Sequence, residues 1–262
     1  MSAIRGTTIP NNAANDATVS KPNAWTGPLP LLYHDPQFIN LERHRHAGLR
    51  EIGDYGFTRE TNSVPLGADE IFLIQAYCPV VFTASDPALP VAVLGIGNNN
   101  SFLDSEGKWR VGVPIPAYIR RYPFIAATDP TAKRIVLAVD EASSAFAMEG
   151  GRPLFENDAP SEFAKLALKF CADFQAQLDL SRMIGEAVES ARLLASRRVD
   201  VRSADGKAMS LDGFRVIDEA RFNALPDKTF LTWRKNNWLG VIYAHFLSMR
   251  RWEVFAGFPN QT

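Results

Sequence analysis

The side chains best suited to binding an anion are concentrated in one short segment between two prolines. This segment contains Tyr118, Arg120, Arg121 and Tyr122. A guanidinium group presents a planar fork of N–H donors that fits carboxylate and phosphate, and tyrosine hydroxyls add further donors. We therefore predict that, if the protein binds a small anionic ligand, these four residues hold it.

Two acidic residues, Asp140 and Glu141, come directly after a predicted buried strand. Carboxylates at the end of a strand can complete a ligand site or neutralise nearby arginines inside the fold. Asp140 and Glu141 are therefore candidate members of the ligand site. The alternative is a structural network in which they tie the arginine-containing loop to the sheet.

His245 is the last candidate binding residue. It shares a helix face with Trp238 and Ile242. Histidine titrates near neutral pH and suits general-base chemistry. No nucleophile is identifiable beside it, which favours a core histidine held by hydrogen bonds.

No metal or cofactor is predicted. His44 and His46, with His34 and Glu42 nearby, are the nearest approach to a metal-binding cluster. No second pair of ligands completes the four that zinc needs, so we interpret His44 and His46 as solvated surface histidines. The segment that begins at Gly95 lacks the third glycine of a dinucleotide-binding loop.

Charge and hydropathy limit the partners. The 28 basic and 29 acidic residues balance, which argues against a nucleic-acid-binding surface. No apolar run approaches the roughly 20 residues needed to cross a bilayer. Without an apolar leader segment, a water-soluble cytoplasmic protein is expected, and leaderless export to the cell surface is the alternative. We expect Cys78 and Cys171 to be buried as small apolar residues.

The chain alternates between predicted strands and helices. Residues 1–24 are poor in large apolar groups and are predicted to be a disordered arm, followed by a single domain over 25–262. Apolar runs separated by turn residues predict short strands. They lie at VVFTA, VAVLGIG, Ser101–Asp104, Arg134–Asp140, VDVRS, KAMSL and GFRVID, with a hairpin turn at Asp205–Gly206.

Helical periodicity is clearest in the second half of the chain. Apolar residues spaced by three and four predict one long helix over Ser161–Leu194, with Leu166 among the residues of its apolar face. A short helix follows from Glu219, and a last helix is predicted over Asp227–Arg250. Because the long helix exceeds the width of a compact domain, it is a candidate surface for a protein partner or a homo-oligomer.

Several motifs, in this order, make the chain resemble the SapC family. They include ERHRHAGLR, TNSVPLGADE, KWRVGVPIPAYIRRYPF, PLFENDAPS, LDGFRVIDEARFNALPD and WLGVIYAHFLSM. The resemblance spans nearly all of Gly27–Arg250. It implies a role linked to the bacterial cell surface, at the surface layer or in outer-membrane uptake, and supplies no catalytic residues.

We therefore predict an α+β (mixed α/β) fold with a central, mostly antiparallel sheet, on which the long helix and a C-terminal helix pack. Two functional hypotheses follow. The first is a non-enzymatic binding or assembly factor linked to the bacterial cell surface. The second is an enzyme or an accessory subunit that binds a small anionic ligand near Arg120, Arg121, Asp140 and Glu141.

Overall fold

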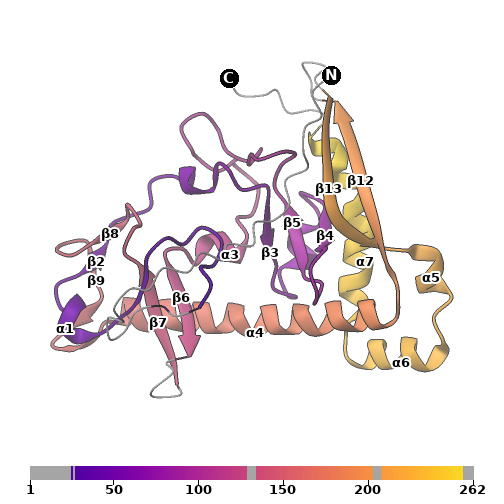
Figure 1. Ribbon diagram of the computed structural model, residues 1–262. Helices are drawn as coiled ribbons and strands as arrows, with labels where there is room; N and C mark the ends of the chain where they lie inside the picture. Colours follow the sequence, from indigo (N-terminus) through magenta and orange to yellow (C-terminus); the bar gives the residue numbers. More distant parts are fainter. Residues whose placement is uncertain (1–24, 26, 129–133, 203–207, 256–262) are drawn as a thin grey trace. The chain divides into compact units, whose positions relative to one another are not determined.

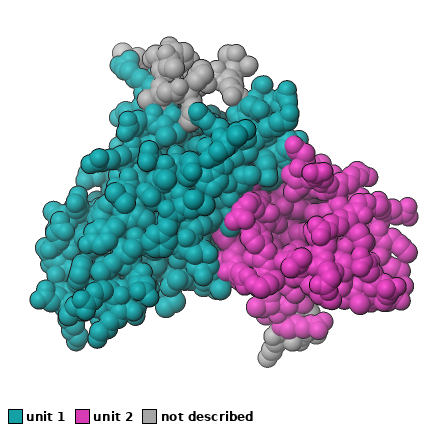
Figure 2. All heavy atoms as spheres, turned by 180° about the vertical axis from the view of Figure 1, so that it is seen from behind, with its two compact units in different colours: residues 1–9, 54–118, 176–262 teal, residues 10–53, 119–175 magenta. Residues whose placement is uncertain are grey.

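The computed structural model describes residues 25, 27–128, 134–202 and 208–255, which form two compact units (Figure 2). Unit 1 contains Asp54–Tyr118 and the described residues from Ala176 onward, and unit 2 contains the described residues up to Gly53 together with Ile119–Gln175. The single domain over 25–262 stays a prediction. The predicted arm over 1–24 lies outside the described residues.

Unit 1 is built on a five-stranded antiparallel sheet with the order β12-β13-β4-β5-β3 (Figure 1). The strands are β3 (Ser63–Pro65), β4 (Val80–Thr83), β5 (Pro90–Val93), β12 (Leu194–Arg202) and β13 (Ala208–Ile217). The predicted pairing of the VVFTA and VAVLGIG segments is confirmed. The predicted strand at Ser101–Asp104 is wrong, because there Leu103 forms an isolated bridge with Trp109. The predicted Asp205–Gly206 turn lies outside the described residues.

Short helices complete unit 1. They are η1 (Gly56–Thr58), α2 (Ile71–Ile74), α5 (Glu219–Asn223), α6 (Asp227–Lys235), α7 (Leu239–Ser248) and η2 (Met249–Phe255). The helix α7 packs on β4, on β13 and on α2. Strands β4 and β5 are buried along almost their whole length, so the core of this unit lies between them and α7.

The prediction of one helix over Asp227–Arg250 is wrong, because the chain turns between α6 and α7. Asn237 takes the left-handed conformation with φ 60°, which asparagine tolerates better than most residues. The N–H of Trp238 donates to the carbonyl of Trp233 at 3.0 Å, and the N–H of Asn237 to that of Arg234 at 3.1 Å. These two bonds form a Schellman motif that ends α6.

The long helix is α4 (Glu162–Ser190), as predicted to within a few residues. Ser161 precedes the helix as its N-cap, and its hydroxyl accepts the N–H of Ala164 at 3.2 Å. The predicted apolar face is wrong at Leu166, whose side chain is 59% exposed. In unit 1, the backbone of Gly185 lies directly against the carbonyl of Ala88, and a Cβ there would be 1.8 Å from that oxygen.

Unit 2 contains small antiparallel sheets, with the orders β1-β7-β6, β8-β2-β9 and β10-β11. Its strands are β1 (Pro36–Phe38), β2 (Gly48–Leu49), β6 (Phe124–Thr128), β7 (Ile135–Asp140), β8 (Phe146–Ala147), β9 (Arg152–Pro153), β10 (Phe155–Glu156) and β11 (Ala159–Pro160). The helix α1 (Leu41–His44) follows β1, and α3 (Ala117–Arg120), which begins in unit 1 and ends in unit 2, precedes β6. The predicted strand over Arg134–Asp140 is confirmed as β7.

Apolar residues from the strands of unit 2, from the turns beside these strands and from the first half of α4 form one core. It contains Ala47, Leu49, Phe124, Leu137, Val139, Ala145, Leu154 and Cys171. Antiparallel sheets combined with a long helix and a C-terminal helix confirm the α+β class. Among the described residues, no helix has the length and apolar character needed to cross a bilayer.

Candidate functional site

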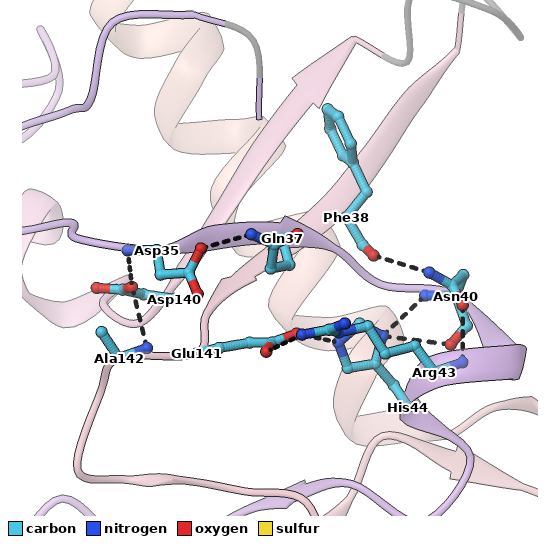
Figure 3. Close-up of polar contacts among 9 residues, drawn as sticks. All are labelled: Asp35, Gln37, Phe38, Asn40, Arg43, His44, Asp140, Glu141 and Ala142. Carbon is cyan, nitrogen blue, oxygen red and sulfur yellow. Dashed lines mark hydrogen bonds and ion pairs between the residues drawn. The ribbon is translucent and has the colours of Figure 1, made fainter. Parts of the chain in front are cut away.

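The best-defined polar site in unit 2 lies at the end of β7, where β1 and β7 pair (Figure 3). Asp140 is completely buried. Its carboxylate accepts the backbone N–H of Asp35 at 2.7 Å, of His34 at 3.1 Å and of Ala142 at 3.3 Å. These bonds offset the cost of burying the charge and fix the segment before β1 against the end of β7.

Tyr122 supplies a further bond to this carboxylate. Its hydroxyl donates to Asp140 Oδ2 at 3.2 Å. Burial, together with the negative charge of Asp140, raises the pKa of Tyr122 to about 12. Tyr122 therefore stays protonated and acts as a hydrogen-bond donor at neutral pH.

Glu141 binds a different pair of residues, both from α1. Arg43 donates from Nε and Nη2 to the two oxygens of Glu141, at 2.5 Å each, and His44 Nε2 lies 3.1 Å from Oε1. Burial favours the neutral acid, but the bonds from Arg43 and His44 outweigh it and lower the pKa of Glu141. Glu141 is therefore ionised and acts as an acceptor at neutral pH.

His44 is positioned by the first turn of α1. The side chain of Asn40 caps this helix by accepting the N–H of Arg43, and the N–H of Asn40 lies 3.2 Å from His44 Nδ1. Burial lowers the pKa of His44 despite the Glu141 carboxylate. A neutral ring that accepts at Nδ1 and donates from Nε2 to Glu141 satisfies both contacts.

The interpretation of His44 as a surface residue is wrong, because its side chain is fully buried. Arg43 and Asn40, which position the site, were not singled out from the sequence. The capping spacing from Asn40 to Arg43 is readable, but nothing in the sequence indicates the pairing with a glutamate 98 residues away. In the part of the chain that the structure describes, no three His, Cys, Asp or Glu side chains lie close enough to hold a metal ion.

Arg120 and Arg121 lie on aromatic rings of unit 2. The guanidinium of Arg120, which is exposed, lies 5.1 Å from the ring centroid of Phe170. That of Arg121, which is buried, lies 5.0 Å from Phe174 and 5.6 Å from Tyr33. Such cation–π contacts compensate part of the cost of burying a guanidinium.

The two remaining predicted site residues belong to unit 1. Tyr118 is buried and is the last residue of the segment Asp54–Tyr118. His245 is also buried, where its Nε2 accepts the N–H of Ile217 at 3.0 Å and its Nδ1 lies 2.7 Å from the carbonyl oxygen of Val80. Burial lowers the pKa of His245 to about 4. Of the two alternatives for His245, a general base or a core histidine held by hydrogen bonds, the structure shows the core histidine.

The structure therefore brings Tyr122 to Asp140 and places Glu141 against α1. Ligand binding by the seven residues stays a prediction.

A comparison with protein-family models matches residues 39–254 to the SapC model. The chain belongs to the SapC family. A comparison with curated proteins finds no match, and neither does a comparison with solved structures.

Membership of the SapC family applies to most of the chain and so to both units. The matched range begins at Ile39, just before α1, and ends at Val254, within η2. It includes Arg43, Glu141 and the buried Asp140. The polar site at the end of β7 therefore lies within the SapC-matched region.

Proposed function

We propose that this SapC-family protein is a non-enzymatic binding or assembly factor linked to the bacterial cell surface, and that it works as a homodimer. The observation that supports this proposal is an apolar surface in unit 1. We call it the α2–α7 surface and define it as Phe72, Leu73, Tyr243 and Leu247. Their side chains are between 48% and 60% exposed.

The α2–α7 surface comes from two helices that pack on each other. Gly240 allows this close approach, since a Cβ there would lie 2.8 Å from the ring of Phe72. Gly240, Tyr243 and Leu247 are spaced by three and four residues and so share one face of α7. The opposite face of α7 is buried in the core of unit 1.

The composition of this surface favours a second copy of the chain as its partner. Neither α2 nor α7 contains Asp, Glu, Lys or Arg. Interfaces between identical subunits are more apolar than other interfaces, and their centres are depleted of charge and enriched in aromatic residues. A charge-free patch is also complementary to itself, as a two-fold symmetric interface requires.

Sedimentation equilibrium over a range of protein concentrations tests the dimer. We expect a dimer for the unmodified chain and a monomer for Leu247→Lys, because a buried lysine at the interface would lack a partner. Leu166→Lys is the matched control, since Leu166 is exposed to nearly the same extent and lies on α4 in unit 2. A monomer at every concentration would contradict the dimer, and equal dissociation by both substitutions would contradict the α2–α7 surface as its interface.

The link to the cell surface rests on family membership and needs a separate measurement. Chemical crosslinking in intact bacterial cells, followed by mass spectrometry, identifies the neighbours of the protein. We expect proteins of the cell envelope among them. Crosslinks to cytosolic proteins alone would contradict this part of the proposal and leave the dimer to be judged by sedimentation.

A further inference from the structure

A depression of about 460 Å³ in unit 1 lies between the end of α4 and the turn that follows α5. Its wall on the α4 side includes Arg192 and Leu193, and its other wall includes Arg221, Leu225 and Pro226. The volume lies in the range of sites for small molecules, although the depression is open to solvent. The residues that line it include two arginines and no acidic residue.

Hydrogen bonds to backbone carbonyls hold the two walls together. The N–H of Asp218, which precedes α5, donates to the carbonyl of Leu193 at 2.8 Å. Arg221 Nη1 donates to the carbonyl of Arg192 at 3.1 Å. The backbone of Arg192 and the guanidinium of Arg221 are therefore held in place before a ligand binds, which reduces the entropy cost of binding.

The two guanidinium groups keep donors for a ligand. Within the described residues, the side chain of Arg192 forms no hydrogen bond or ion pair, and both arginines are exposed. Arg221 forms an ion pair with Asp218, but its Nε lies 3.7 Å from Oδ2, which is too long for a hydrogen bond. An anion between Arg192 and Arg221 would gain charge-assisted bonds from both.

The backbone of Arg192 is in an unfavourable conformation. Its φ is 55°, and it occupies the position of a Schellman motif where glycine is usual, with the N–H of Leu193 bonded to Val188 at 3.1 Å. A side chain in this region costs roughly 1–2 kcal/mol. An arginine near a helix end interacts favourably with the carbonyls, but this does not require it at the left-handed position itself.

We propose that this depression binds a small carboxylate with an apolar body. The carboxylate lies between Arg192 and Arg221, and the body lies against Leu193, Leu225 and Pro226. Five of the seven lining residues are apolar, which favours an amphipathic ligand over inorganic phosphate. Ligand binding then explains why an arginine occupies a position where glycine is usual.

Titration of the full chain with octanoate, followed by ¹H–¹⁵N correlation spectra, tests this site. We expect saturable shifts in the amide signals of Arg192, Leu193 and Leu225, with a Kd of roughly millimolar order for so small a ligand. Octylamine has the same body with a positive charge and should cause no saturable shift at these residues. Inorganic phosphate should bind more weakly than octanoate.

Three variants separate the site from general charge effects. Arg221→Gln should weaken octanoate binding about tenfold or more, and Arg198→Gln, which removes an exposed arginine of β12, should leave it unchanged. Arg192→Gly should weaken binding and also raise the midpoint of thermal unfolding, because glycine accepts a positive φ. The absence of saturable shifts, or equal affinity in all three variants, would overturn the proposal.

Discussion

At the scale of single residues, this protein holds its buried polar side chains mainly through backbone groups. Asp140 accepts three backbone N–H groups, and His245 lies between the N–H of Ile217 and the carbonyl of Val80. Such contacts join segments that are far apart in the sequence. The protonation state of His245 therefore affects the stability of the fold.

The burial of His245 predicts how stability changes with pH. Its pKa is about 4 in the folded protein and near 6.5 in the unfolded chain. Above pH 6.5 the ring is neutral in both states, and it makes its full contribution to the free energy of unfolding. Between pH 6.5 and 4 the unfolded chain takes up a proton that the folded protein does not. The free energy of unfolding should therefore fall by about 3 kcal/mol over this range.

Urea unfolding between pH 7.5 and 4 measures the fall, and NMR titration of the His245 ring measures its pKa directly. The lowered pKa of His44 adds to the loss in the same direction, so the NMR measurement assigns the share of His245. A ring of His245 that titrates near pH 6.5 in the folded protein would contradict the prediction, whatever the urea curves show.

At the scale of elements, periodicity and turn residues were enough to locate α4, β4 and β5. Breaks that depend on special backbone geometry could not be predicted from the sequence. The spacing of apolar residues located α4, and prolines and turn residues located β4 and β5. The break between α6 and α7 was missed because the pattern of apolar residues continues across it and does not reveal the left-handed conformation of Asn237. The burial of His44 was missed because its partner Glu141 is distant in sequence.

Gly185 shows how one residue sets the packing of α4 in unit 1. Alanine favours a helix by about 1 kcal/mol over glycine, so in an exposed helix Gly185→Ala would stabilise the protein. Here the new Cβ would lie 1.8 Å from the carbonyl oxygen of Ala88, and backbone would have to move. We expect the free energy of unfolding to fall by roughly 2–4 kcal/mol.

Thermal and urea unfolding measure this change. Glu186→Ala, at the exposed neighbouring position, is the control and should change stability by less than about 0.5 kcal/mol. A Gly185→Ala variant as stable as the unmodified protein would show that α4 does not approach Ala88 closely.

At the scale of the whole molecule, each unit contains one of the two cysteines, and α4 contributes residues to both units. Cys78 lies in unit 1 and Cys171 in unit 2, and both are free and buried. Burial raises the pKa of each thiol to about 12. Both should therefore be unreactive in the folded protein, because the thiolate is the nucleophile.

Thiol reactivity thus reports the unfolding of each unit separately and tests the predicted single domain over residues 25–262. Cys171→Ala leaves the thiol of unit 1, and Cys78→Ala leaves that of unit 2. If the chain is one domain, each thiol should become reactive at the urea midpoint measured by circular dichroism for the same variant, because the shared helix couples the two units. A thiol that reacts at clearly lower urea than the loss of helix would show that its unit unfolds alone, and the chain would then consist of two domains.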